Sequence, residues 1–252
     1  MTADIATQAQ QETVTFTVNG KTMQGRRGDS LLKVLLHEGY DIPHLCYHEA
    51  VTAYGSCRLC LVEVKKGRKT KVTTSCNYPL MDGIEVTTNS EKIRKHRKVV
   101  FELLLAQVPN SPELQSMAAQ YGVTDTRFEK KYQDCILCGL CERVCREVVG
   151  VNALGFMGRG VEKDVGAPFK QPSKTCIGCG ACVYVCPVNC IKEEQLPTKR
   201  TIVRWERNLP MQTCKRCGYP FAPTYQLLQM QKQTGLPWEF FELCPDCRDV
   251  KD

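Results

Sequence analysis

The sequence predicts an α+β protein divided into several small modules, and three observations support this class. The 252 residues contain 17 cysteines, which fall into separate groups along the chain. β-Hairpin signals and helical periodicity alternate in the first half. A cysteine-rich segment that begins at Cys135 is repeated 41 positions later, at Cys176. Modules of roughly 50 to 80 residues have marginal hydrophobic cores, so cysteine-bound metal is expected to stabilise each of them.

Composition argues against a membrane protein and against an exported one. Hydrophobic residues make up 42% of the chain and charged residues 24%, as in soluble globular proteins. The longest apolar run, residues 99–108, is interrupted by Glu102 and Gln107 and is shorter than the roughly 18 residues of a membrane span. Residues 1–12 lack the basic and apolar parts of a secretory signal. We therefore expect a cytoplasmic protein whose cysteines bind metal rather than form disulfides.

The formal net charge of +7 is the observation that favours nucleic-acid binding. If sixteen cysteines act as thiolates in four metal centres, each centre contributes about −2, and the loaded protein has a net charge of roughly −1. A metal-stabilised nucleic-acid binder that uses the basic residues 92–98 is thus the least favoured function, and we expect no nucleic-acid partner.

The first module, residues 12–90, has the pattern of two hairpins around a helix. Asn19-Gly20 is a strong signal for a two-residue hairpin turn. Ser30 is a suitable N-cap and Gly39 a suitable stop for the helix. The elements expected are strands at 14–18, 21–25, 59–65, 71–75 and 83–88, and a helix at 31–38.

A short helical linker is expected over residues 91–130. The first helix starts at Glu91 and ends before Pro109, and a second runs from the N-cap Ser111 to about Tyr121. We expect one side of the first helix to carry its apolar residues and the basic residues to be solvated, with a partner-docking surface as the alternative for the basic face. The apolar side is Ile93, Val100, Leu103, Leu104 and Gln107, and the basic residues are Lys92, Lys95, Arg97 and Lys98.

The repeat in residues 131–192 is the most specific signal in the chain. Its two copies share the spacing C-x2-C-x2-C-x3-C, in which three thiolates hold one [4Fe-4S] cubane and the fourth holds the other. The expected ligand sets are therefore crossed: Cys135, Cys138, Cys141 and Cys186 for one cluster, and Cys176, Cys179, Cys182 and Cys145 for the other. Gly139 and Gly180 relieve crowding beside the clusters, and Ile136 and Ile177 shield them from water.

This region resembles a bacterial two-cluster ferredoxin. Pro187 follows Cys186 as in that family, whereas Arg146 follows Cys145 in place of a proline. A cation at this position is expected to raise the potential of the neighbouring cluster. Two zinc knuckles are the alternative, but the paired spacing fits them poorly.

The first group of cysteines is Cys46, Cys57, Cys60 and Cys76. With the preceding hairpin and helix, it resembles the amino-terminal [2Fe-2S] domain of the large iron-sulfur subunit of respiratory complex I and of related hydrogenase subunits. The resemblance covers residues 12–192 and implies a β-grasp fold and a [2Fe-2S] cluster, with zinc as the alternative.

One cluster of those relatives is missing from this sequence. It has one histidine and three cysteine ligands between the two modules, whereas residues 77–134 contain no cysteine. We therefore expect His96 to lie on a helix surface, and His44 and His48 to pack near the Cys46 loop rather than bind iron.

The last module, residues 200–252, follows a polar connector at 193–200. Its two CxxC pairs, Cys214 with Cys217 and Cys244 with Cys247, predict a zinc-ribbon-like knuckle with a tetrahedral thiolate site. Zinc is expected, and a further iron-sulfur cluster or a single rubredoxin-type iron are the alternatives. A helix at 224–233, stopped by Gly235, fits between the pairs. Cys190 is left over and is expected to be a buried thiol outside any metal site.

Clusters ligated by four cysteines carry electrons and offer no position for a substrate. The chain also has no G-x-G-x-x-G on a strand–helix turn, no P-loop and no nucleophile elbow, so flavin and nicotinamide are expected on another chain. We thus expect no catalytic residue of its own.

The resemblance implies a non-catalytic electron-transfer subunit of an NAD(P)-linked oxidoreductase complex. Its hetero-oligomeric partners would be an NAD(P)H-oxidising flavoprotein and a hydrogenase or formate dehydrogenase subunit. Soluble ferredoxin would join them if the complex is electron-bifurcating. The alternative is a free-standing ferredoxin-like carrier or scaffold, which would be a monomer that exchanges electrons with several partners.

Overall fold

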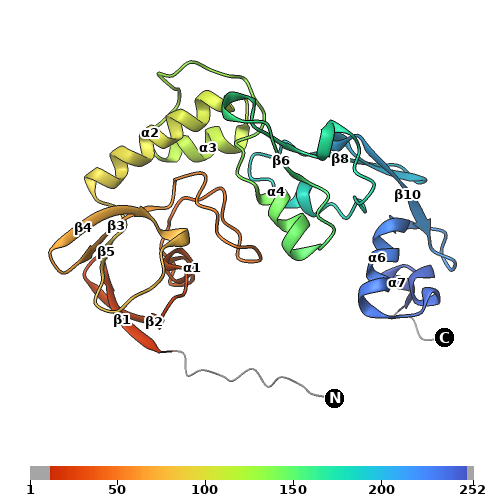
Figure 1. Ribbon diagram of the computed structural model, residues 1–252, viewed down its shortest axis with the longest axis horizontal. Coiled ribbons are helices and arrows are strands. Elements are labelled where there is room, and N and C mark those ends of the chain that lie inside the picture. The colour runs from red at the N-terminus through yellow and green to blue at the C-terminus, as the bar shows by residue number, and fades with distance from the viewer. Residues whose placement is uncertain (1–11, 249–252) are drawn as a thin grey trace. The chain divides into compact units, whose positions relative to one another are not determined.

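The computed structural model describes residues 12–248 (Figure 1). The described residues form two compact units, one that ends at Cys138 and one that begins at Gly139. Both contain helices and strands, which confirms the predicted α+β class. Within residues 12–248, none of the helices combines the length and the apolar character that crossing a bilayer requires.

The first unit is built on a five-stranded sheet with the order β2-β1-β5-β3-β4. β1 and β5 pair in parallel, and the other neighbours are antiparallel. Its elements are β1 (Thr13–Val18), β2 (Lys21–Arg26), α1 (Leu31–His37), β3 (Leu61–Lys66), β4 (Lys69–Thr74), β5 (Glu85–Thr87), α2 (Glu91–Gln107) and α3 (Pro112–Gln120). The expected elements of residues 12–121 are thus all present, with small differences at their ends.

Local sequence determines the first hairpin. Asn19 and Gly20 both have positive φ angles, 49° and 85°, as a two-residue turn between twisted strands requires. The alternating residues Val14, Phe16 and Val18 point from β1 into the core, where they pack with the helix α1. Because the same core contains buried cysteines of the first group, the sheet and the candidate metal site form one packed structure.

The predicted face of α2 is partly wrong. Ile93 and Leu104 are buried as expected, but Leu103 is 50% exposed. Arg97, one of the basic residues expected to be solvated, is only 2% exposed, and its guanidinium donates a hydrogen bond of 2.8 Å to the Leu61 carbonyl oxygen. The Leu61 carbonyl of β3 pairs with one guanidinium nitrogen, while the buried Nε of Arg97 has no hydrogen-bond partner among the described residues. Periodicity within the helix does not reveal a partner on another element.

The second unit combines short helices with two antiparallel sheets. One sheet has the order β11-β10-β9-β8, and the other pairs β6 with β7. The elements are α4 (Leu140–Arg143), a π-helical turn (Val144–Val148), β6 (Gly155–Met157), β7 (Asp164–Gly166), α5 (Ala181–Tyr184), β8 (Glu193–Gln195), β9 (Lys199–Ile202), β10 (Arg207–Thr213), β11 (Pro220–Pro223), α6 (Thr224–Thr234) and α7 (Pro245–Arg248).

The expected connector at residues 193–200 is instead part of this sheet. β8 and the start of β9 occupy it, and Glu194 pairs with Thr201. β9 in turn pairs with β10, with Ile202 opposite Arg207. The polar composition of β8 reflects its exposed edge position and does not indicate an absence of structure. The expected helix at 224–233 is present as α6 and ends at Gly235, whose φ is 70°.

Candidate metal centres

The first group of cysteines converges at the edge of the first unit's core. Cys46, Cys57, Cys60 and Cys76 are all buried. Their thiols form two adjacent pairs. A hydrogen bond with Cys46, together with burial, raises the pKa of Cys57, and a hydrogen bond with Cys76 lowers the pKa of Cys60 to about 7. Two thiol pairs side by side match the donor set of a two-iron centre, in which each iron takes two cysteines.

Backbone groups around this site are directed at the sulfurs. The Cys57 N–H donates to Cys46 Sγ and the Leu45 N–H donates to Cys57 Sγ, both at 3.4 Å. Such donors stabilise the negative charge of a cysteine ligand. The donor set and its surroundings therefore fit the expected [2Fe-2S] cluster.

Two serines connect the ligand loops to regular structure. Ser30 precedes α1 as expected, but its hydroxyl does not cap the helix and instead donates to the Cys76 carbonyl oxygen at 2.7 Å. Ser75 donates to the Cys60 carbonyl oxygen at 2.8 Å. Sequence reasoning missed both roles, because each partner lies at least 15 residues away along the chain.

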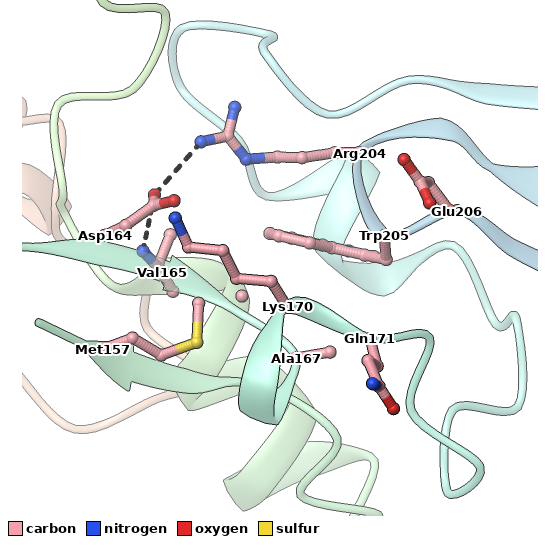
Figure 2. A pocket seen from close by; sticks show the side chains of 10 residues that line it. Met157, Asp164, Val165, Ala167, Lys170, Gln171, Arg204, Trp205 and Glu206 are labelled. Carbon is pink, nitrogen blue, oxygen red and sulfur yellow. Dashed lines mark hydrogen bonds and ion pairs between the residues drawn. The ribbon is translucent and has the colours of Figure 1, made fainter.

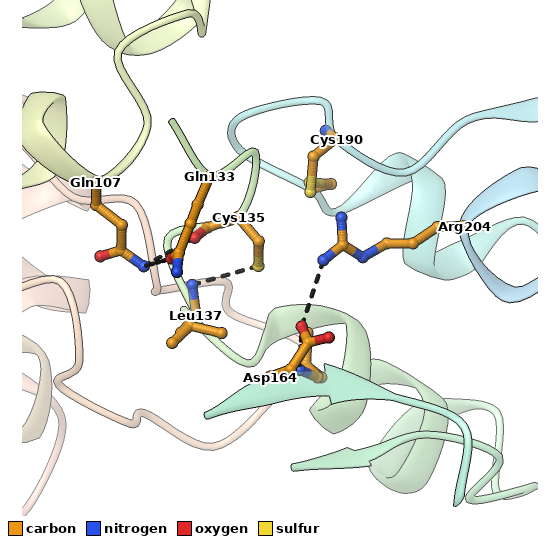
Figure 3. Close-up of polar contacts among 9 residues, drawn as sticks. Gln107, Gln133, Cys135, Leu137, Asp164, Cys190 and Arg204 are labelled. Atoms are coloured by element: carbon orange, nitrogen blue, oxygen red, sulfur yellow. Dashed lines mark hydrogen bonds and ion pairs between the residues drawn. The ribbon is translucent and has the colours of Figure 1, made fainter. Parts of the chain in front are cut away.

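Cys135 and Cys138 lie at the end of the first unit. The Gln107 side-chain amide, at the end of α2, donates to the Cys135 carbonyl oxygen at 2.8 Å, and the Leu137 N–H donates to Cys135 Sγ at 3.3 Å (Figure 3). Ile136 is 5% exposed, in keeping with its expected shielding role. The helix thus fixes the backbone at the first cysteine of the repeat.

In the second unit, four cysteines from both copies of the repeat surround one cavity. They are Cys145, Cys176, Cys179 and Cys182, the set expected to hold one crossed cluster. Burial raises the pKa of Cys182 to about 12, and the other three thiols act in the same direction. The remaining lining is mostly apolar and includes Val149, Val151, Leu154, Ile177, Ile202 and Trp205. A dry cavity with four thiols fits a [4Fe-4S] core.

The hairpin formed by β9 and β10 packs on the loop that carries three of these thiols. Arg200 donates to the Gly178 carbonyl oxygen at 3.1 Å, and Arg207 donates to the Cys176 carbonyl oxygen at 3.3 Å. Gly178 has a φ of 70°, and a Cβ added there would lie 2.5 Å from Leu209 Cδ1. This contact has no signal in the sequence, because it depends on the pairing of distant strands.

Cys141 lies on α4, and Cys186 follows α5. The expectation for Cys190 is wrong in part, since it is half-buried and its Sγ lies 3.6 Å from Cys186 Sγ. The Cys190 N–H also donates to Cys186 Sγ at 3.3 Å. The hydrogen bond with Cys190 lowers the pKa of Cys186 to about 6.

Arg146, the residue that stands in place of a proline after Cys145, is paired with two carboxylates. Its guanidinium lies 2.6 Å from Glu142 and 2.9 Å from Glu147. These carboxylates balance the cation, which weakens the expected effect of Arg146 on the cluster potential.

The carboxy-terminal cysteines form the tightest group. The Sγ atoms of Cys214, Cys217, Cys244 and Cys247 all lie within 4.8 Å of one another, and Cys217 and Cys244 are 3.8 Å apart. Four sulfurs at about 2.3 Å from a tetrahedral ion are separated by about 3.8 Å. This geometry fits a single ion and not a cubane, which would hold its cysteine sulfurs further apart.

The three histidines considered in the sequence have backbone partners. Nδ1 of His44 lies 2.8 Å from the Ile42 carbonyl oxygen, and Nδ1 of His48 accepts from the Ala50 N–H at 3.2 Å. His96 is exposed on α2, with Nδ1 2.7 Å from the Lys92 carbonyl oxygen.

Comparison with known domain families assigns the two cysteine-rich regions. Residues 11–91 match the model of the 2Fe-2S iron-sulfur cluster binding domain, and residues 134–190 match that of the 4Fe-4S dicluster domain. The matches include both candidate regions but not the carboxy-terminal cysteines.

Similar proteins come from two kinds of complex. The chain is 30% identical to the NADH-ubiquinone oxidoreductase 75 kDa subunit of Reclinomonas americana, over 75% of this chain and 30% of that protein. It is also 30% identical to the NADP-reducing hydrogenase subunit HndD of Solidesulfovibrio fructosivorans, over 72% of this chain and 36% of that one. The chain thus spans about a third of the length of these relatives.

A solved structure of more similar length provides the clearest comparison. A chain in the crystal structure of an NAD+-reducing [NiFe]-hydrogenase in the H2-reduced state is 30% identical, with a TM-score of 0.55. The match covers 62% of this chain and 75% of that one. This protein therefore belongs to the iron-sulfur family that includes this hydrogenase chain and the 75 kDa subunit of NADH-ubiquinone oxidoreductase.

Proposed function

We propose that this protein is an electron-relay subunit with one [2Fe-2S] and two [4Fe-4S] clusters. The observation that carries the proposal is the convergence of four thiols at each of two places. These are the buried group Cys46, Cys57, Cys60 and Cys76 in one unit, and the partly buried group Cys145, Cys176, Cys179 and Cys182 in the other. A centre with four cysteine ligands has no open coordination position. Such a centre supplies one-electron transfer when it is bound, and no site for substrate chemistry.

The thiol pairs of the first group support a two-iron centre, with Cys46 and Cys57 on one iron and Cys60 and Cys76 on the other. The cavity in the second unit supports the crossed assignment, since Cys145 comes from the first copy of the repeat and its three partners from the second. By the same rule, Cys135, Cys138, Cys141 and Cys186 are proposed to ligate the other cubane.

The carboxy-terminal site is proposed to hold structural zinc. The short distances among its four sulfurs support one tetrahedral ion. Zinc adds no redox chemistry, so this module would contribute stability and a docking surface, and would lie outside the relay.

We further propose that the relay connects an NAD(P)H-oxidising flavoprotein to a hydrogenase or formate dehydrogenase subunit. The relatives named above are subunits of NADH and NADP-linked complexes, which supports this choice of partners. A ferredoxin-dependent bifurcating complex is the more specific form of the proposal.

Serine substitution in the complete complex tests the relay. Cys46→Ser and Cys60→Ser are expected to abolish electron flow between nicotinamide and the terminal acceptor, because a tunnelling chain fails when one centre is lost. Each partner should keep its own activity with an artificial dye. Lys33→Ala, an exposed change on α1, should behave as the unchanged complex. Full coupled activity of the cysteine variants would contradict the proposal.

Anaerobic purification distinguishes the relay subunit from the alternative, a free-standing carrier. A relay subunit should copurify with its partner chains, with about ten iron atoms and one zinc per copy. A monomer that reduces several unrelated acceptors would support the carrier instead.

A further inference from the structure

The indole of Trp205 contains a buried hydrogen-bond donor without a partner. Trp205 is the last residue of a 3-10 turn (Val203–Trp205) between β9 and β10 and is only 7% exposed. Among the described residues, its Nε1 has no hydrogen-bond partner. A buried donor left unpaired costs about 1–3 kcal/mol, so native proteins rarely retain one without a role.

This donor lies at the cysteine cavity of the second unit. Trp205 lines the cavity together with the four thiols of the crossed set. Cys182 is one of these thiols, and the Trp205 side chain opposes the rise in the pKa of this thiol that burial causes. The orphaned N–H and the Cys182 sulfur therefore belong to one site.

Neighbouring groups pack closely around the indole. The Arg204 guanidinium lies 5.6 Å from the indole ring and is paired with Asp164 at 3.4 Å (Figure 2). Trp205 also borders a pocket of about 260 Å³ that Asp164, Lys170 and Arg204 help to line. A Cβ added at Gly166 would lie 3.5 Å from the ring, which shows how closely β7 approaches it. Trp205 thus takes part in the lining of both this pocket and the cysteine cavity.

The fold brings Trp205 to the cluster site from outside the region that matches the dicluster family. That match ends at residue 190, and Trp205 comes from the hairpin that follows it. The same hairpin bonds the ligand loop through Arg200 and Arg207. Two arginine–carbonyl contacts therefore join the hairpin that carries Trp205 to the backbone of the ligand loop.

We propose that Trp205 is a positioning residue that donates an N–H···S hydrogen bond to the Cys182 sulfur and raises the reduction potential of the cluster held there. The proposal rests on the proposed function, because it requires the [4Fe-4S] cluster. A donor at a ligand sulfur stabilises the reduced cluster more than the oxidised one, since reduction adds negative charge to the sulfurs. Outer hydrogen bonds of this kind tune cluster potentials.

Trp205→Phe in the full chain, purified anaerobically, tests the proposal. Phenylalanine keeps an aromatic ring and removes the donor. We expect unchanged iron and sulfide content, and a more negative midpoint potential for one [4Fe-4S] cluster in an EPR-monitored titration. The other two clusters should keep their potentials. The matched control is Trp238→Phe, which changes the second tryptophan of the chain and should shift no potential.

A second measurement keeps the proposal testable if Trp205→Phe loses iron. In the Trp238→Phe protein, Trp205 is the only indole, so ¹⁵N-indole labelling marks it alone. Electron–nuclear double resonance of the reduced cluster should then detect the ¹⁵N nucleus and its exchangeable proton. Absence of this coupling, or equal potentials in fully loaded Trp205→Phe and unchanged protein, would overturn the inference while leaving the relay function intact. Absence of two [4Fe-4S] signals in the unchanged protein would overturn both.

Discussion

The buried guanidinium of Arg97 on α2 donates a 2.8 Å hydrogen bond to the carbonyl oxygen of Leu61, the residue that follows Cys60. Burial lowers the pKa of Arg97 from its ordinary value, but an arginine this basic stays charged at neutral pH. This contact joins the helical linker to the strand next to the first cysteine group.

Replacing Arg97 is therefore expected to destabilise the first unit. Arg97→Met retains much of the apolar stem and leaves the Leu61 carbonyl without its donor, at an expected cost of about 1–3 kcal/mol in the free energy of unfolding. Denaturant unfolding, followed by the visible absorbance of the clusters, measures it. The matched control is Arg94→Met on the exposed side of the same helix, with an expected change below about 0.5 kcal/mol. Equal losses for both variants would show that the buried contact is unimportant.

Gly178→Ala is expected to impair cluster binding at the site lined by Cys145, Cys176, Cys179 and Cys182. The substitution places a Cβ at a φ of 70°, which costs about 1–2 kcal/mol, and forces it against Leu209. We expect a lower unfolding temperature and a partial loss of iron. Gly235→Ala is the control, because this residue has the same φ of 70° but nothing within 4 Å of an added Cβ. If the two variants lose stability equally, strain alone explains the effect and the contact with Leu209 does not.

Cys190 is expected to support a cluster without ligating it. Cys190→Ala removes the thiol but keeps the backbone N–H that donates to Cys186 Sγ. The iron content should therefore stay at about ten atoms, whereas Cys186→Ala should lose up to one cubane. Iron and sulfide analysis of the two variants provides the comparison. Loss of iron in Cys190→Ala and retention in Cys186→Ala would identify Cys190 as the cluster ligand and Cys186 as the supporting residue.

A substitution at the carboxy-terminal cysteines is expected to remove the metal bound there and to leave the iron content unchanged. Cys217→Ser removes one of four closely spaced sulfurs, so zinc should fall from about one atom per chain to near zero while iron stays at about ten. Elemental analysis of the purified protein measures both. Because metal binding contributes to folding in small knuckles, protease should also cut the last fifty or so residues faster. A parallel loss of iron and no change in zinc would instead favour an iron site.

Local signals predicted the elements of the first unit well. Asn19-Gly20 determines a turn by its own backbone preferences, and Ser111 caps α3 through a hydrogen bond from the Leu114 N–H, only three residues away. The spacing of the repeat likewise predicted which cysteines surround the cavity in the second unit. Each of these features depends on residues close in sequence or on a ligand pattern with strict geometry.

The features that escaped prediction depend on distant partners. Arg97 is buried because the Leu61 carbonyl lies beside it, and the polar residues of β8 form a strand because β9 pairs with them. A single tryptophan such as Trp205 has no sequence signal, since its proposed role depends on a cavity assembled by three separate segments. At these positions, contacts between residues distant in sequence determine burial and secondary structure, and local propensity and periodicity do not predict them.

The parallel pairing of Val18 with Val86 has a consequence for biosynthesis. β5 is the last strand of the five-stranded sheet to leave the ribosome, and it occupies the middle position between β1 and β3. A nascent chain thus exposes all four cysteines of the first group before its sheet can close. Iron delivery to this module is accordingly expected after residue 87 has emerged, so a ribosome-stalled chain ending earlier would remain colourless.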